Sequence, residues 1–272
     1  MDSSSSTADW FQDRIAASVA PLLPGFAVEA VAEMDSTNTE LMRRARAGRV
    51  EPVLLVAERQ TAGRGRLGRP WQSGAQQDAA VSLTFSLGMP LAPADWSGLS
   101  LAVGVAVAEG LDPSGAHKIG LKWPNDVWVE DRKLVGILIE TALPSDGGPD
   151  ASRYVVIGIG INIGAREGDG MRTPPAWLHQ WRPGASAPEV LAELAEPLVR
   201  TVLDFEARGF APFAERFAAR DVLRGREVAL SDGTAGLCEG VAWGGELQVR
   251  TDAGLQLISS DEVSVRPRGM SF

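Results

Sequence analysis

The pattern of apolar residues changes once along this chain, at about Asp221. From Val28 to that point, runs typical of buried strands alternate with amphipathic patterns typical of helices. Beyond it, short strands of alternating polarity are separated by glycine-containing turns. We therefore expect an α+β fold with a tail and short helix over residues 1–27, a main domain over residues 28–221 and a small β-barrel over residues 222–272.

The composition argues against several classes of protein. The formal net charge of −9 does not suit general nucleic-acid or anionic-membrane binding, which needs a broad basic surface. The single cysteine, Cys238, excludes an intrachain disulfide, and the only histidines, His117 and His179, cannot form a histidine-based metal cluster. Residues 1–13 lack the features of a signal peptide, and no apolar run reaches the roughly 20 residues that span a bilayer. We expect a soluble, cytoplasmic protein.

Residues 59–71 concentrate positive charge in this acidic chain. Four arginines are interleaved there with three glycines. Glycine leaves the backbone free to rearrange and to approach a ligand closely, and an arginine guanidinium can hold carboxylate or phosphate oxygens with two hydrogen bonds. The segment therefore predicts a mobile loop that closes over an anionic small molecule.

Two further clusters carry polar residues within apolar strand patterns. Lys122 and Lys133 both lie in such patterns, where burial without a partner costs several kcal/mol. Asp126 could pair with either lysine, and Lys133 stands at the entrance of a strand from which its amine could reach a cleft. Residues 158–162 form a glycine-containing strand that ends in Asn162, but as a dinucleotide fingerprint they are weak because no helix follows.

Five short motifs together resemble those of biotin–protein ligases. They occur in the family order: Asp-Ser-Thr-Asn at residues 35–38, Gly-Arg-Gly-Arg-x-Gly-Arg at 63–69, Lys-Trp-Pro-Asn-Asp at 122–126, Lys-Leu-x-Gly-Ile-Leu at 133–138 and Gly-x-Gly-Ile-Asn at 158–162. The resemblance implies a mixed-sheet catalytic domain with packed helices, as in biotin and lipoate ligases, and a small SH3-like barrel at the C-terminus.

The resemblance also implies a two-step reaction with ATP and biotin as substrates and Mg²⁺ on the phosphates. The biotin carboxylate attacks the α-phosphate to give biotinyl-5′-AMP, and a lysine of a biotin carboxyl carrier domain then accepts the biotinyl group. Two unit charges about 4 Å apart repel by roughly 4 kcal/mol at an effective dielectric constant near 20. Arg64, Arg66 and Lys133 are the expected catalytic cations because they would offset this repulsion.

The matching positions give a set of expected binding residues. The biotin contacts are Ser36, Thr37, Asn38, Gln60, Gly63, Arg64, Gly65, Arg66, Trp71, Lys133, Gly136, Leu138 and Gly158. The nucleotide contacts are Arg66, Arg69, Asn125, Lys133, Asn162 and Trp177. The metal ligands, the identity of the acceptor protein and the choice between monomer and homodimer stay open.

The chain departs from the family pattern in two places. About 30 residues precede the first motif, too few for the winged-helix DNA-binding domain that many bacterial members carry. We therefore expect a monofunctional ligase that binds no nucleic acid. Residues 73–80 lack the aromatic residue and the usual glycine of the family, which changes the expected packing near biotin.

Three alternatives remain at this point. A lipoyl or octanoyl transferase shares the expected fold, but the arginine loop and residues 122–126 disfavour it. A non-catalytic biotin sensor is disfavoured by Lys133 and the loop arginines. An RNA-binding module is predicted by the basic loop alone and opposed by the acidic balance of the whole chain.

Overall fold

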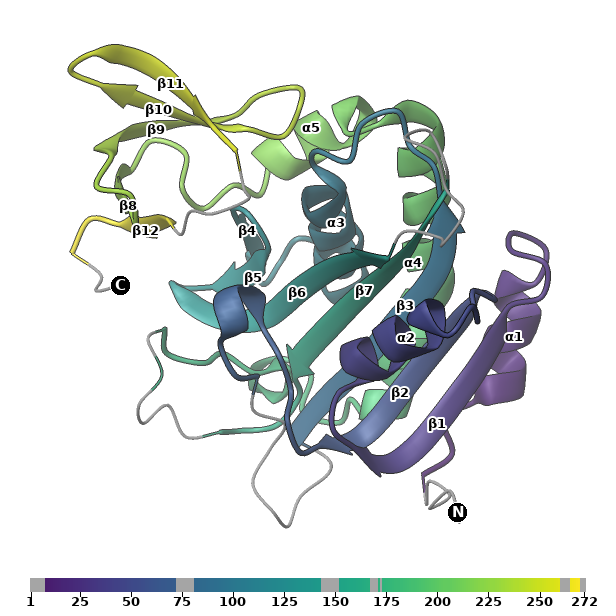
Figure 1. Cartoon of the computed structure of the whole chain (residues 1–272). Coiled ribbons are helices and arrows are strands. Elements are labelled where there is room, and N and C mark those ends of the chain that lie inside the picture. The colour runs from purple at the N-terminus through teal and green to yellow at the C-terminus, as the bar shows by residue number, and fades with distance from the viewer. Residues whose placement is uncertain are drawn as a thin grey trace. The chain divides into compact units, whose positions relative to one another are not determined.

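The computed structural model of this protein describes residues 8–71, 81–142, 152–166, 171, 173–259 and 265–269 (Figure 1). Its contacts divide the chain into two compact units. The first unit comprises residues 1–92, 134–167 and 175–200, and the second comprises residues 93–133, 168–174 and 201–272. The predicted domain boundaries at 27/28 and 221/222 stay a prediction.

The first unit is built on a mixed sheet. Its strands lie in the order β1-β2-β3-β7-β6, where β1 and β2 are parallel and the remaining neighbours are antiparallel. Their bounds are β1 Ala27–Met34, β2 Val53–Gln60, β3 Ser82–Leu91, β7 Arg153–Asn162 and β6 Arg132–Ala142, of which the part from residue 134 onward belongs to this unit.

Helices cover both faces of this sheet (Figure 1). Helix α2 (Thr37–Arg46) lies across the face that Figure 1 presents to the viewer, and residues 187–200 of α4 (Ala187–Arg208) pass behind it. Helix α1 (Gln12–Val19) packs by β1, with Ile15 and Val19 buried. Under α2 the core consists of apolar side chains from α2, β2 and β7: Leu41, Met42, Val53, Leu55, Tyr154 and Val156.

The strand register brings small and polar residues together on neighbouring strands. Ser86 on β3 pairs with Gly158 on β7, which pairs with Leu138 on β6. In the next row, Gly160 on β7 pairs with Gly136 on β6. Directly paired residues of adjacent strands project from the same face of a sheet, so the glycines leave a shallow strip of sheet surface beside Ser86.

The second unit combines helices with a separate antiparallel sheet. It holds α3 (Leu99–Leu111), the pair β4 (Gly120–Lys122) and β5 (Asp126–Val129), and α5 (Ala211–Ala218). Ten of the 13 residues of α3 are buried, which explains why its sequence is apolar on all sides. The small sheet has the order β11-β10-β9-β8-β12, with bounds β8 Glu227–Leu230, β9 Ala235–Val241, β10 Leu247–Thr251, β11 Gly254–Ile258 and β12 Val265–Pro267.

The α+β prediction is confirmed, and so is the change of pattern beyond Asp221. The expected turns lie between consecutive strands of the small sheet, at residues 231–234, 242–246 and 252–253. A tight turn lies between β5 and β6, with positive φ at Glu130 and Asp131. The departing segment, residues 73–80, lies outside the described residues. Within the described ranges, no helix combines the length and the apolar character that crossing a membrane requires.

Candidate functional site

The start of α2 joins the ends of two strands through buried hydroxyl and amide groups. Ser36 caps the helix, its Oγ accepting a hydrogen bond from the backbone of Thr39 at 3.4 Å. Gln60, the last residue of β2, accepts the backbone N–H of Thr37 with its Oε1 at 2.7 Å. The Thr37 and Ser86 hydroxyls lie 2.6 Å apart. This cluster therefore combines three predicted biotin contacts with one serine that the motifs did not indicate.

Asn38 completes the cluster through hydrogen bonds to residues of β3 and β6. Ser86 Oγ donates to Asn38 Oδ1 at 2.6 Å, while Asn38 Nδ2 donates to the Leu138 carbonyl at 3.3 Å and to Glu140 Oε2 at 3.0 Å. Asn38 can occupy this place because position 158 has no side chain: a Cβ there would overlap the Asn38 amide. The first glycine of the fifth motif thus makes room for the Asn38 side chain.

The arginine loop folds back on itself after β2. The backbone N–H of Gly65 donates to the carbonyl of Arg69 at 2.7 Å, and that of Trp71 donates to the carbonyl of Gly63 at 2.8 Å. Gly63 leaves room for this closure, because a Cβ there would overlap the Trp71 carbonyl. The described loop is therefore a closed turn. Its predicted mobility without ligand stays a prediction.

Trp71 brings the end of this loop onto the glycine strip. A Cβ at Gly160 would overlap its indole ring, and the guanidinium of Arg166 lies 5.8 Å from the ring centroid. Arg166 also donates to Asn162 Oδ1 at 2.5 Å, and burial lowers the pKa of Arg166. Asn162 Nδ2 in turn donates to the carbonyl of Ala176 at 2.9 Å. The loop, the end of β7 and the segment before Trp177 thus meet within the first unit.

The second unit holds a separate group of charges around Asp126. Lys133 Nζ donates to Asp126 Oδ1 at 2.6 Å, and Lys122 lies with its ammonium 5.6 Å from the Trp128 ring centroid. Burial would raise the pKa of Asp126, but the charges of Lys133, Lys122 and Arg266 outweigh it and hold that pKa below its usual value of 3.8. Three cations therefore face one carboxylate, an excess of positive charge suited to phosphate groups.

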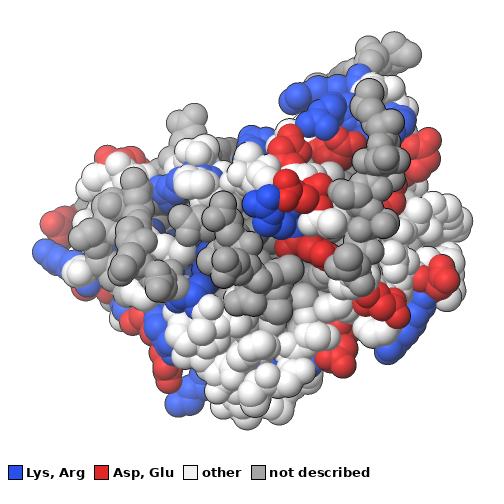
Figure 2. Space-filling model, turned by 90° about the horizontal axis from the view of Figure 1, so that it is seen from below, with Lys and Arg blue, Asp and Glu red and all other residues white. Residues whose placement is uncertain are grey.

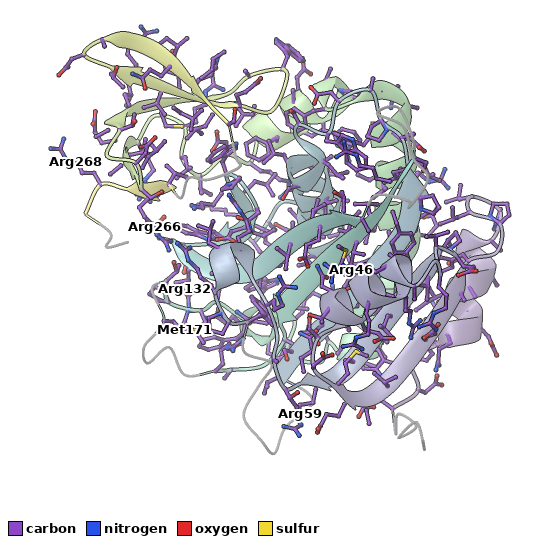
Figure 3. All side chains as sticks on the ribbon, viewed as in Figure 1. Arg46, Arg59, Arg132, Met171, Arg266 and Arg268 are labelled. Atoms are coloured by element: carbon purple, nitrogen blue, oxygen red, sulfur yellow. The ribbon has the colours of Figure 1, made fainter. Side chains whose placement is uncertain are left out.

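Arg266 reaches this group from β12 in the small sheet (labelled in Figure 3). Its side chain is buried and donates to Thr173 Oγ1 at 2.6 Å. Asn125, the predicted nucleotide contact next to Asp126, is partly buried. On the face shown in Figure 2, basic and acidic side chains are interspersed over the described residues.

The predicted site residues fall into two groups, one in each unit. The first unit contains those of α2, the loop, β6, β7 and the segment after it: Ser36, Thr37, Asn38, Gln60, Gly63, Arg64, Gly65, Arg66, Arg69, Trp71, Gly136, Leu138, Gly158, Asn162 and Trp177. The second unit contains Asn125 and Lys133. Their binding roles stay predictions. Among the described residues no three His, Cys, Asp or Glu side chains gather to hold a metal ion.

Four polar residues beside these groups lie outside the five motifs: Ser86, Glu140, Arg166 and Arg266. Each stands outside a motif or just past its end. A signal was nevertheless present for Glu140 and Arg266, since a charge that interrupts an apolar strand pattern needs a partner.

Comparisons with known proteins decide the family. A model described as the biotin/lipoate A/B protein ligase family matches residues 31–162. Biotin--[acetyl-CoA-carboxylase] ligase of Paracoccus denitrificans is 34% identical over 241 residues, which cover 86% of this chain and 98% of that protein. The chain belongs to the biotin/lipoate protein ligase family. The resemblance predicted from the five motifs is thereby confirmed.

Other members of the biotin/lipoate ligase family agree in sequence and in fold. Bifunctional ligase/repressor BirA of Escherichia coli (strain K12) is 33% identical over 250 residues, covering 90% of this chain and 75% of BirA. A biotin protein ligase from Aquifex aeolicus, solved in complex with biotin and ATP, superposes with a TM-score of 0.73 at 29% identity, covering 88% of this chain and 98% of that one. The mixed sheet and the separate C-terminal sheet are thus features of this ligase fold.

Proposed function

We propose that this chain is a biotin–protein ligase. It joins the carboxylate of biotin to the α-phosphate of ATP, releasing pyrophosphate, and then transfers the biotinyl group from AMP to a lysine of a biotin carboxyl carrier domain. ATP enters as its magnesium complex, so Mg²⁺ is part of the substrate. We further propose that the enzyme acts in the cytoplasm, where a lone thiol such as Cys238 stays reduced.

The hydrogen-bond directions in the buried cluster carry this proposal. Asn38 Nδ2 faces two oxygens, so its Oδ1 must face Ser86 and takes the single hydroxyl hydrogen of that serine. Ser86 must then accept from Thr37, whose one hydrogen also lies near Gln60 Oε1, at 3.1 Å between the heavy atoms. Both hydroxyl hydrogens are thus committed inside the protein while acceptor capacity remains.

A ligand that contacts the Thr37 and Ser86 hydroxyls must therefore bring hydrogen-bond donors. The ureido ring of biotin offers two N–H groups, whereas the alkyl chain of octanoate and the dithiolane ring of lipoate offer none. Burying such an apolar group against unsatisfied acceptors would cost about 1–3 kcal/mol per group. The cluster favours biotin over the other acids that the family name covers.

The cations supply the electrostatic part of the proposal. The arginine loop carries Arg64, Arg66 and Arg69, and a separate group carries Lys133, Lys122 and Arg266 around Asp126. Fixed cations of this kind offset the repulsion between a carboxylate and a triphosphate and stabilise the charge that develops at the α-phosphate.

Mass spectrometry of a carrier domain tests the proposal directly. After incubation with this protein, biotin and Mg·ATP, the carrier domain should gain one biotinyl group on a lysine. Gain of lipoyl or octanoyl from those acids instead would identify a transferase of the other branch, and biotin binding without pyrophosphate release would identify a sensor.

Single substitutions test which residues carry the activity. Arg66→Ala and Lys133→Ala should each slow pyrophosphate release by about a hundredfold or more, the usual effect of removing a group that stabilises developing charge. Arg46→Ala serves as the control, because Arg46 is an exposed arginine of α2 (Figure 3) that no motif includes.

A further inference from the structure

Glu140 links the two segments expected to hold biotin in the first unit. It lies near the end of β6, where it pairs in register with Val156 of β7. Its Oε2 accepts from Asn38 Nδ2 at 3.0 Å, and its Oε1 lies 3.1 Å from a guanidinium nitrogen of Arg64. One carboxylate therefore joins the start of α2 to the arginine loop.

Through Asn38, Glu140 determines the direction of the hydrogen bonds that link Asn38, Ser86 and Thr37. A carboxylate only accepts, so the Asn38 NH₂ group must face Glu140 and its oxygen must face Ser86. That choice fixes Ser86 as donor to Asn38 and Thr37 as donor to Ser86. Without the carboxylate, only the Leu138 carbonyl at 3.3 Å would keep the Asn38 amide from turning over.

The same carboxylate holds Arg64 of the loop and leaves part of its guanidinium available to a ligand. The side chain of Arg64 is 47% exposed and that of Glu140 is 21% exposed. A guanidinium carries five N–H donors, so Arg64 can keep its contact with Glu140 and still offer other N–H groups to an anionic ligand. The ion pair thus orients the arginine before the ligand arrives.

We propose that Glu140 is a positioning residue for biotin binding, which presets the Asn38–Ser86–Thr37 hydrogen bonds and orients Arg64. The inference rests on the proposed ligase function. It assigns to Glu140 an effect on biotin affinity, because both of its partners, Asn38 and Arg64, are expected biotin contacts, and any effect on the chemistry at the α-phosphate passes through Arg64 alone.

Two substitutions of Glu140 separate its two contacts. Glu140→Gln can still accept from Asn38 but loses the charge that holds Arg64, and a partly exposed ion pair of this kind is worth up to about fivefold in affinity. Glu140→Leu loses both contacts, so we expect biotin to bind about 50-fold more weakly, with the amide of Asn38 free to turn over.

Calorimetric titration with biotin and steady-state kinetics of pyrophosphate release measure the effect. The Kd and KM for biotin should rise in the order wild type, Glu140→Gln, Glu140→Leu, while KM for ATP stays within about twofold and kcat at saturating biotin changes less than the biotin affinity. In an Arg64→Gln background, Glu140→Gln should have no additional effect. Glu33→Gln is the matched control, since Glu33 pairs with Arg59 on the exposed part of β1 and β2 in the same unit.

The outcomes distinguish this inference from the proposed function. If wild-type protein binds no biotin, the proposed function fails and the inference with it. If wild-type protein is an active ligase and both Glu140 variants bind biotin as tightly as Glu33→Gln, the inference alone is overturned. A fall in kcat with unchanged biotin affinity overturns it as well. If the thermal transition shows that Glu140→Leu does not fold, the biotin affinities of Glu140→Gln, alone and in the Arg64→Gln background, still test the inference.

Discussion

Lys133 Nζ lies 2.6 Å from Asp126 Oδ1, seven residues away across the turn that precedes β6. The lysine predicted to meet ATP is therefore held by a carboxylate. The sequence left open whether Asp126 pairs with Lys122 or Lys133. The direct hydrogen bond goes to Lys133, whereas Lys122 rests over Trp128 and acts on Asp126 through its charge.

Asp126→Asn should destabilise the protein at neutral pH and much less in acid. The folded-state pKa of Asp126 is lower than 3.8, so its stabilising effect is present above that pH and is lost as the pH falls through the folded-state value. Removing the charge leaves three cations without their carboxylate, at a cost of about 1–3 kcal/mol at pH 7 for a pair that is not fully buried. Urea unfolding at pH 7 and pH 3 measures this difference, and equal deficits at the two pH values would contradict the prediction.

Asp221→Asn should have the opposite effect. Burial raises the pKa of Asp221 to about 6, against hydrogen bonds from the backbone of Leu223 and Arg224 that lower it. The contribution of Asp221 to stability is thus full below pH 3.8 and is lost as the pH rises through 6, a change of about 3 kcal/mol. The asparagine variant should therefore be more stable than the wild type at pH 8 and not at pH 3.5. Asp252→Asn, at an exposed turn, should change stability little at either pH.

Gly160→Ala should weaken biotin binding without unfolding the sheet. The added Cβ would overlap the Trp71 indole, so Trp71 must shift, and a displacement of this order in a binding site costs about ten- to a hundredfold. Calorimetry with biotin and the thermal transition of each variant measure the two effects. Gly184→Ala is the control because a Cβ there meets nothing within 4 Å. Unchanged biotin affinity in Gly160→Ala would show that Trp71 does not contact the ligand.

Sequence motifs located the segments of the candidate site but not the contacts between them. Residues 35–38, the arginine loop and residues 158–162 are recognisable because each motif is continuous in the chain. The hydrogen bond from Asn38 to Glu140 spans 102 residues and that from Ser86 to Asn38 spans 48. No local pattern specifies such pairs, because they depend on strand register and on how α2 packs against the sheet.

The sheet order also depends on contacts that no local pattern specifies. Alternation of strand and helix patterns predicted that strands and helices follow one another from Val28 to Asp221, as the structure has them. It did not predict the sheet order β1-β2-β3-β7-β6, in which β7 lies between β3 and β6. That order places Gly158 and Gly160 on a central strand. Because neither has a side chain, Asn38 can pack against Gly158 and Trp71 against Gly160.

Biotin and ATP together should protect the arginine loop from trypsin. Trypsin cleaves after Arg64 and Arg66, whereas the bond after Arg69 resists because Pro70 follows. The loop is held by backbone contacts such as Gly65 to Arg69 and by the ion pair of Arg64 with Glu140. Leu67 at its tip is 56% exposed with a left-handed φ of 56°. Such a segment has little buried apolar surface to oppose local opening, and cleavage follows the population of the open form.

If the arginines close over biotin and the nucleotide, that population falls and cleavage slows by at least about tenfold. The rate is read from the fragments ending at Arg64 and Arg66, and cleavage after the exposed Arg46 serves as the internal reference. Equal rates with and without the two substrates would show that the loop does not close over them.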